Sequence, residues 1–296
     1  MSTAPQPIRT ATHIPHIFVS GPSSWNTLVY LDHLPDPRPH TVFAQETVET
    51  PGGTSLGKAL NLVALGAQIS LLTPLGTDKR GQMLEDIITR IGITELGARS
   101  DVTERHINLM TRTGERLSIY AATPTNFTGP SNSALASTFG KFDALVVDLS
   151  ERSAQLAPTA AASGTPVWTD LHDYDGASSF HEPFAEAADY VFLNNDALPD
   201  PRPLMSRLVT EGKKLVVCTL GADGCLAITP QSGFIRGQAS PTEVIDTNGA
   251  GDAFMSAVLM STLAGLPIEQ ALEAGAHNAS QALRSTHLHP SLDGLV

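Results

Sequence analysis

The sequence predicts an α/β fold, a three-layer sandwich in which a mostly parallel central sheet carries helices on both faces. Short apolar runs typical of buried strands alternate along the chain with longer segments of helical periodicity. Such alternation favours a parallel sheet, because each helix returns the chain to the edge where the next strand begins. The chain has 296 residues, 41% of them hydrophobic, which suits one large α/β domain.

The expected strands are the apolar runs at residues 17–20, 69–74, 144–148, 167–170, 190–193 and 215–219. The expected helices lie at about 55–66, 79–91, 151–163, 203–212, 249–264 and 267–284. Asp78 is placed to cap the second helix, and Gly265 with Pro267 separates the last two. Sheets of this kind bind ligands beyond the carboxyl ends of their strands.

Two extended, polar segments, 41–50 and 103–120, interrupt the alternation. The second contains Thr113-Gly114-Glu115-Arg116, which predicts a hairpin turn. Together these segments, over about 41–51 and 103–123, are expected to form a small β-lid over a cleft. Two ordinary surface hairpins are the alternative, and the pattern alone leaves both open.

Composition excludes several classes of partner. The net charge of −12 argues against nucleic acid and anionic membranes as partners, and no apolar run approaches the ~20 residues of a membrane span. The N-terminal residues 1–16 are polar and Pro-rich without an apolar signal core, so we expect a disordered lead-in. Two cysteines give no disulfide framework, and a cytoplasmic protein is the simplest expectation.

Residues 246–254, Asp-Thr-Asn-Gly-Ala-Gly-Asp-Ala-Phe, place a glycine-rich turn before an apolar helix. The small residues Gly249, Ala250 and Gly251 let backbone N–H groups approach an anion, and the helix N-terminus adds favourable charge. Asp252, in the first turn, is placed to accept a proton from an attacking hydroxyl. The alternative is an N-capping Asp after a flexible turn.

Two other nucleotide-binding motifs with glycine-rich patterns do not match this sequence. Residues 52–59 nearly match a P-loop, but Ala59 lacks the metal-binding hydroxyl and no apolar strand precedes Gly52. A dinucleotide-binding fingerprint fails as well, since the Gly249-x-Gly251 pair lacks a third glycine and lies near the C-terminus. Gly52 and Gly53 could also be a simple turn before a helix.

The 246–254 segment resembles the second signature of the PfkB/ribokinase family of small-molecule kinases, D-T-x-G-A-G-D-x-F, at every fixed position. The first family signature is similar to Gly52-Gly53, Ala59 and the segments 65–66 and 76–81. This resemblance covers about residues 14–284. It implies one ribokinase-like domain over 1–296 that transfers the ATP γ-phosphoryl group to a hydroxyl of a sugar or sugar-like small molecule.

The resemblance also implies roles at the acceptor end. Asp252 would be the base, and the amides of Gly249, Ala250 and Gly251 the anion hole. Gly52 and Gly53 would lie against the substrate, together with Gly57, which stands where the family has Asn; Lys58 or Asn61 would then replace that carboxamide. Sugar hydroxyls would bond Asn26, where relatives carry Asp, with Asp32 as a second candidate, while Trp25 either stacks on the substrate or is buried.

For the nucleotide, the resemblance points to a T-x-G-x-x-G turn and an N-x-x-E motif. The first is matched by Thr219, Gly221 and Gly224, although a hairpin turn explains the same residues. The second begins at Asn194 but has Ala197 in place of Glu, so Asn195 and Asp196 would compensate. The resemblance also implies that Asn278 contacts adenine, unless it is only a solvated helix residue, and that Asp246 binds a cation, with K⁺ left open. Asp170, at the end of a strand, is a further candidate for ordering water bound to Mg²⁺, although the segment 171–176 could also be only a polar loop.

Exposed lid strands favour edge-to-edge pairing, so a homodimer through the lid is expected. Two alternatives to a sugar kinase stay open at this point. One is a nucleoside kinase of the same fold, since Trp25 and Asn26 depart from familiar sugar kinases. The other is a ligand-binding relative without turnover, suggested by Gly57 and Ala197 but opposed by the retained Asp252.

Overall fold

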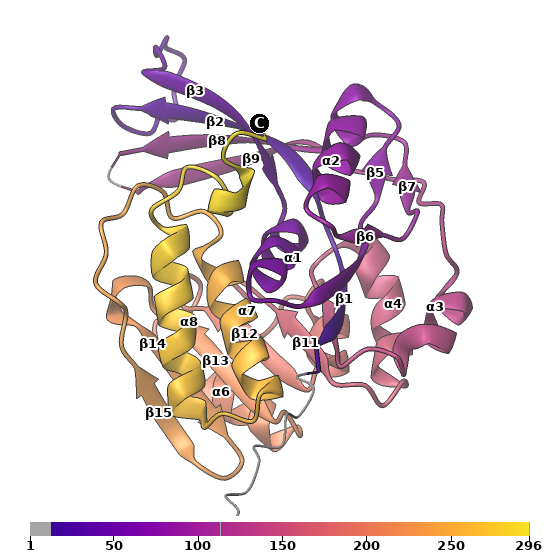
Figure 1. Ribbon diagram of the computed structural model, residues 1–296. Coiled ribbons are helices and arrows are strands. Elements are labelled where there is room, and N and C mark those ends of the chain that lie inside the picture. Colours follow the sequence, from indigo (N-terminus) through magenta and orange to yellow (C-terminus); the bar gives the residue numbers. More distant parts are fainter. Residues whose placement is uncertain (1–12, 113, 296) are drawn as a thin grey trace, which may run out of the picture.

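Within the residues that the computed structural model describes, 13–112 and 114–295, a nine-stranded sheet forms the centre of the protein (Figure 1). Its strand order is β15-β14-β13-β12-β11-β10-β1-β4-β6. The bounds are β1 (His16–Ser20), β4 (Gln68–Leu72), β6 (Thr94–Glu95), β10 (Ala144–Val147), β11 (Val167–Asp170), β12 (Tyr190–Asn194), β13 (Leu215–Thr219), β14 (Cys225–Thr229) and β15 (Gly233–Gly237). The pairings of β14 with β13 and with β15 are antiparallel and the others in this sheet are parallel, so the predicted mostly parallel sheet is confirmed.

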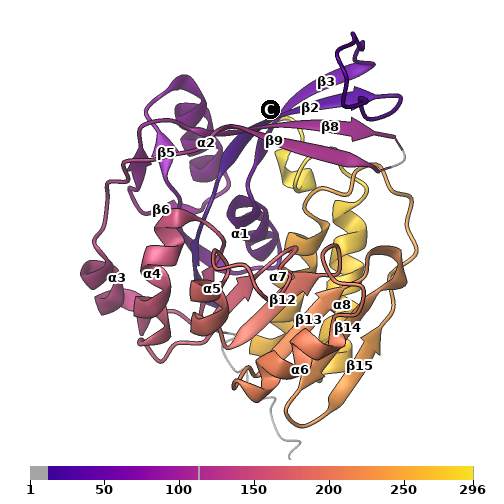
Figure 2. The same cartoon turned by 180° about the vertical axis from the view of Figure 1, so that it is seen from behind.

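Helices cover both faces of this sheet (Figure 2). One face carries α1 (Thr54–Ala64), α2 (Lys79–Arg90), α7 (Ala250–Leu263) and α8 (Ile268–Ala282); the other carries α3 (Asn132–Phe139), α4 (Glu151–Ala161), α5 (Glu182–Ala187) and α6 (Arg202–Thr210). Alternate residues of β1 separate the two cores, because Ile17 and Val19 pack with the first group and Phe18 with the second. The three-layer sandwich is therefore confirmed, although the short helices α3 and α5 were not predicted. No helix among the described residues is long and apolar enough to span a bilayer.

Asp78 caps α2, as its position before the helix predicts. Its Oδ1 accepts hydrogen bonds from the backbone N–H groups of Arg80 and Gly81. The same carboxylate accepts from the backbone N–H and the hydroxyl of Thr103. One side chain thus stabilises the start of α2 and fastens the residue before β8 (Glu104–Thr111) to the sandwich.

A second, four-stranded sheet has the order β3-β2-β8-β9 and is called the small sheet below (Figure 1). The expected segments supply β3 (Glu46–Gly52), β8 and β9 (Arg116–Ala122), but β3 begins at Glu46 and not at 41. The inner strand β2 (Ser24–Leu31), which pairs with both β3 and β8, was not predicted. β8 and β9 pair antiparallel, as expected for a hairpin. Thr113 of the expected turn lies outside the described residues, and so do residues 1–12 of the expected N-terminal lead-in.

The remaining elements are short. β5 (Leu75–Gly76) and β7 (Arg99–Ser100) form a two-stranded parallel sheet, and η1 (Gly221–Asp223) and η2 (Pro290–Leu292) are single 3₁₀ turns. η1 lies in the connection from β13 to β14, at the carboxyl end of the large sheet. Leu75 of β5 and Leu292 of η2 are fully buried in the core on the α1 side of the large sheet.

Candidate active site

Two cavities meet at the N-terminus of α7. The first, of about 820 Å³, lies between the small sheet and the loops that follow β1, β10 and β11. The second, of about 750 Å³, lies between the β13–β14 turn, the segment 238–247 and α8. Asn194 and Asp196 line both cavities. Ala250 and Gly251 line the second cavity and the next residue, Asp252, lines the first, so the start of α7 stands between the two spaces.

The α7 N-terminus has no side-chain cap among the described residues. Gly249 is its N-cap, with φ of 77°. A Cβ atom at position 249 would lie 3.1 Å from the carbonyl oxygen of Leu288, so both the backbone conformation and the close approach favour glycine. The uncapped amides of the first turn therefore remain available to an anion.

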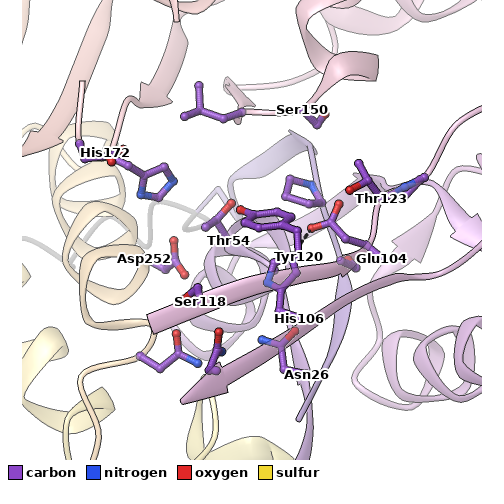
Figure 3. A pocket seen from close by; sticks show the side chains of 18 of the residues that line it. Asn26, Thr54, Glu104, His106, Ser118, Tyr120, Thr123, Ser150, His172 and Asp252 are labelled. Atoms are coloured by element: carbon purple, nitrogen blue, oxygen red, sulfur yellow. Dashed lines mark hydrogen bonds and ion pairs between the residues drawn. The ribbon is translucent and has the colours of Figure 1, made fainter. Parts of the chain in front are cut away.

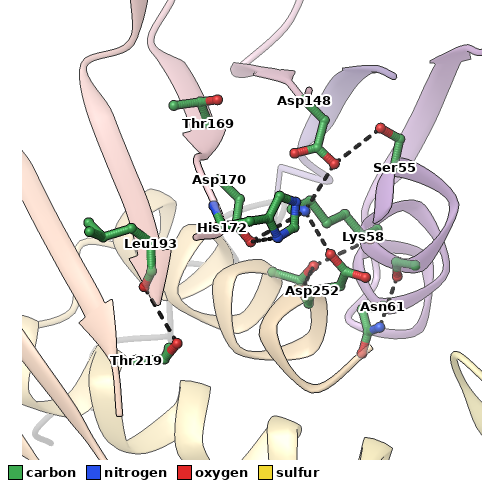
Figure 4. Close-up of polar contacts among 12 residues, drawn as sticks. Ser55, Lys58, Asn61, Asp148, Thr169, Asp170, His172, Leu193, Thr219 and Asp252 are labelled. Carbon is green, nitrogen blue, oxygen red and sulfur yellow. Dashed lines mark hydrogen bonds and ion pairs between the residues drawn. The ribbon is translucent and has the colours of Figure 1, made fainter. Parts of the chain in front are cut away.

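A buried lysine lies beside the candidate base (Figure 4). The Lys58 side chain, on α1, is 1% exposed. Its Nζ is 2.6 Å from Oδ1 of Asp252, 3.0 Å from Oδ2 of Asp148 and 3.6 Å from Oδ2 of Asp170. Asp148 follows β10 and Asp170 ends β11, so the carboxyl ends of neighbouring strands bring these acids to one ammonium group. Sequence analysis did not predict this cluster.

The pKa values of the residues in this cluster are shifted in different directions. Burial raises the pKa of Asp252 to about 6; the charge of Lys58 opposes this shift and that of Asp148 adds to it. Burial also acts to raise the pKa of Asp170, but His172 and Lys58 hold it below its usual value. Burial acts to lower the pKa of Lys58, yet the three carboxylates raise it above its usual range. Asp252 is thus the member suited to proton transfer near neutral pH.

Gly57 makes room for this arrangement. A Cβ atom at position 57 would lie 2.4 Å from Oδ2 of Asp252, so any side chain there would displace the carboxylate. Neither expected replacement for the missing Asn supplies a carboxamide to the cavity. Lys58 binds Asp252, while Asn61 donates to the Gly57 carbonyl and accepts from Asn278. Neither replacement is supported, because Gly57, Lys58 and Asn61 do not line the first cavity, and Gly57 and Lys58 lie against the Asp252 carboxylate.

Below neutral pH, the pH dependence of kcat/KM should follow the protonation of Asp252. A base must be deprotonated to act, so kcat/KM is expected to be constant above about pH 7 and to fall about tenfold per pH unit below the Asp252 pKa of about 6. Measuring kcat/KM at saturating Mg-ATP against pH checks this. Asp32→Asn, which changes an exposed acid outside both cavities, should leave the profile unchanged. An acid limb near the ordinary Asp value of about 4 would contradict the assignment.

Polar side chains of the small sheet face the first cavity in cross-strand rows (Figure 3). Asn26, His106 and Tyr120 pair across β2, β8 and β9, and Asn108 pairs with Ser118 in the next row. A Cβ atom at Gly52 would collide with the amide of Asn26, 2.1 Å away. Asn26 and Gly53 line the cavity, as expected for acceptor contacts, and Gly52 permits the close packing behind Asn26.

Trp25 and Asp32 line neither cavity. Trp25 is 4% exposed, belongs to the core, and donates its indole N–H to Glu49, so the buried alternative holds and stacking on a ligand does not. Asp32 accepts from the amide of Gln45. The aromatic side chain that β9 turns into the cavity is Tyr120, which the strand alternation of 116–122 could have indicated.

The second cavity contains the expected nucleotide turn. Thr219, Gly221 and Gly224 line it, and the two glycines have φ of 57° and 86°. The hairpin alternative is also true, because β13 and β14 pair antiparallel around this turn. Asn278 is placed differently: its amide donates to Asn61 and to the Ala253 carbonyl, which ties α8 to α1 and α7. The predicted adenine contact is therefore not supported, and Ala276, Ala279 and Ser280 line the cavity instead.

Both expected metal-site residues already have protein partners. Asp170 faces Lys58, and Asp246 accepts hydrogen bonds from the Tyr30 hydroxyl and the Asn248 N–H. Among the described residues, no group of three His, Cys, Asp or Glu side chains is arranged to hold a metal ion. A magnesium ion that arrives on the phosphates with its water ligands fits this site better than a protein cage, with Asn194 and Asp196 at the junction of the cavities.

A model of the pfkB family carbohydrate kinases matches residues 22–293, so the chain belongs to this family. It is 31% identical over 266 residues to the acarbose 7(IV)-phosphotransferase of Actinoplanes sp., covering 88% of this chain and 89% of the relative. A microbiome-derived acarbose kinase superposes with a TM-score of 0.82 at 28% identity, covering 96% of this chain and 99% of the other. The ribokinase of Thermotoga maritima shares the fold, with a TM-score of 0.74 at 20% identity and coverage of 93% and 95%.

These likenesses confirm the ribokinase-like fold and the class of enzyme. The protein is an ATP-dependent sugar kinase that transfers a phosphoryl group to a hydroxyl. The alternative of a nucleoside kinase shares this fold, and the sugar-kinase prediction agrees with the family.

Proposed function

We propose that the first cavity binds the acceptor sugar and the second binds ATP, and we call them the acceptor cavity and the nucleotide cavity. Asp252 then accepts the proton of the attacking hydroxyl, while the first-turn amides of α7, at Gly249, Ala250 and Gly251, hold the charge of the transferred group. The placement of these residues between the two cavities supports this division. When bound, Mg²⁺ supplies further charge neutralisation at the phosphates.

We further propose that the acceptor is an oligosaccharide-like molecule of the acarbose type, larger than one sugar ring. The observation that carries this proposal is the polarity of the acceptor cavity. Four residues of its lining, Ser23, Thr54, Asn108 and His181, each carry a buried side-chain atom that has no hydrogen-bond partner in the described structure. Together with Asn26, Ser118 and Ser150 they give the cavity a polar lining, which suits a ligand rich in hydroxyl groups. A volume of about 820 Å³ is that of a pocket for a drug-sized ligand.

The charge of the cavity narrows the class of acceptor. Besides Asp252, its lining contains the acidic residues Glu104, Glu151, Asp173 and Asp196, against a single arginine, Arg116. Such a lining disfavours acceptors that carry phosphate or carboxylate groups. It suits a neutral or cationic acceptor. A relative that is 31% identical to this chain is named acarbose 7(IV)-phosphotransferase, which supports an acceptor of this type.

A substrate panel tests this proposal. ADP release with Mg-ATP would be measured on acarbose, maltotetraose, glucose, ribose and inosine, with the product position read by NMR. The highest kcat/KM is expected on acarbose. Turnover confined to a single-ring sugar would overturn the oligosaccharide proposal, and turnover confined to inosine would favour a nucleoside kinase. The same assay with and without K⁺ tests whether a monovalent ion acts near Asp246.

Three further expectations belong to this proposal. We propose that the small sheet acts as a lid of the single kinase domain, which excludes water during transfer. A homodimer through this sheet is supported by its exposed edge strand β9, where Leu117 and Ile119 are turned away from the acceptor cavity. A cytoplasmic location is supported by the need for ATP and by the two free cysteines, Cys218 and Cys225.

A further inference from the structure

We infer that Glu104, Tyr120 and Asp173 form a subsite for a positively charged nitrogen of the acceptor. This inference rests on the proposed assignment of the first cavity to the acceptor. It adds a specific chemical requirement, an organic ammonium group, to the general polarity of that cavity.

The subsite combines an aromatic ring with carboxylates from two walls of the cavity (Figure 3). Tyr120, on β9, is 65% exposed, which is unusual for a large aromatic side chain and leaves its surface available to a ligand. Its ring centroid lies 4.1 Å from that of His106, on β8. Glu104, two residues before His106, also lines the cavity, while Asp173 belongs to the loop after β11 on the opposite wall.

Glu104 is a buried carboxylate that has a histidine as its partner. This residue is only 8% exposed, and its Oε1 is 2.9 Å from Nε2 of His106. Within the described part of the chain, no Lys or Arg forms an ion pair with it. A cationic ligand in the cavity would therefore add a charge-assisted hydrogen bond that no Lys or Arg of the described chain supplies.

Electrostatics at Tyr120 support the same location. The surrounding cavity walls partly desolvate the Tyr120 hydroxyl and raise its pKa, and the negative charges of Glu104 and Asp173 raise it further, while Arg116 opposes them. Both carboxylates therefore act on one phenol from opposite walls. An ammonium group between them would gain from the two charges and from the face of the aromatic ring.

A neighbouring unpartnered atom indicates a hydrogen-bond donor on the ligand. Asn108 is 3% exposed, lines the acceptor cavity from the same face of the small sheet, and its Oδ1 has no partner in the described structure. Its row follows the His106–Tyr120 row directly. An ammonium or hydroxyl group of the acceptor would supply the donor that this oxygen lacks once the Asn108 side chain rotates toward the cavity.

The test compares two acceptors of similar length. Acarbose has an amine in place of one glycosidic oxygen, whereas maltotetraose has none. Glu104→Gln is expected to raise KM for acarbose about tenfold, equivalent to about 1.4 kcal/mol, and to change KM for maltotetraose less than about twofold, with kcat kept for both. Tyr120→Leu and Asp173→Asn should shift the same ratio in the same direction. Asp32→Asn is the matched control.

Each outcome decides the inference. If Glu104→Gln leaves the ratio of the two KM values unchanged, the subsite inference is overturned, because a merely structural role does not distinguish a charged acceptor from a neutral one. The proposed function would still stand. If Glu104→Gln does not fold, Asp173→Asn provides the same comparison. If wild-type protein phosphorylates neither compound, the proposed function fails. Calorimetry of acarbose then decides the subsite: weaker binding to Asp173→Asn supports it, and equal or undetectable binding overturns it.

Discussion

Asp252→Asn is expected to lower kcat by about 10³-fold while the affinity for ATP stays within about twofold. Asn keeps the size of the side chain and an oxygen for Lys58 Nζ, which is 2.6 Å from Asp252 in the wild type, but it cannot accept the proton of the acceptor hydroxyl. The first-turn amides of α7, which line the nucleotide cavity at Ala250 and Gly251, are unchanged. Steady-state ADP release measures kcat, and calorimetry measures ATP binding.

The control for this variant is Asp86→Asn, which makes the same chemical change on the exposed side of α2. It should keep wild-type kcat and ATP affinity. A kcat of Asp252→Asn within about tenfold of wild type would show that another group removes the proton. Intact ATP binding with no turnover by the wild type on any acceptor of the panel would instead favour a non-catalytic relative.

Lys58→Met is expected to cost about 3–5 kcal/mol of the free energy of unfolding, because it leaves three buried carboxylates without their cation. The protein that remains folded should also show a changed pH profile. Lys58 acts to lower the pKa of Asp252, so its loss should move the acid limb of kcat/KM above about pH 6. Chemical denaturation and the pH profile measure the two effects.

Lys213→Met is the matched control, since Lys213 is also buried but donates to the carbonyl of Glu186, outside the acidic cluster. It should lose less stability and keep the acid limb. Asp148→Asn should shift the pH profile in the opposite direction. The Asp148 charge raises the pKa of Asp252, so its removal should move the acid limb of kcat/KM to lower pH. The double variant Lys58→Met/Asp148→Asn should recover part of the lost stability. If the two lysine variants are equally stable and Lys58→Met keeps the wild-type acid limb, Lys58 neither stabilises the acidic cluster nor sets the pKa of Asp252.

Much of the fold could be predicted because its signals are local. The apolar runs, the cap at Asp78 and the glycine turn at 246–252 are properties of short segments, and each predicted strand and helix is present. The missed helices α3 and α5 are short, and a short helix gives little periodicity. β2 was missed because its residues combine polar and apolar types in a strand that is ordered mainly by its pairing with β3 and β8.

The sequence by itself determined the class of protein, since the signature around Asp252 is contiguous and its chemistry can be read from one turn and one helix. Only the tertiary structure decided how that base is held. Lys58, Asp148, Asp170 and Asp252 lie far apart in the chain and meet because parallel strands end at one edge and α1 packs beside α7. Cross-strand register likewise turned Tyr120, and not Trp25, into the acceptor cavity. Ion pairs and strand register depend on distances between distant segments, which no local pattern specifies.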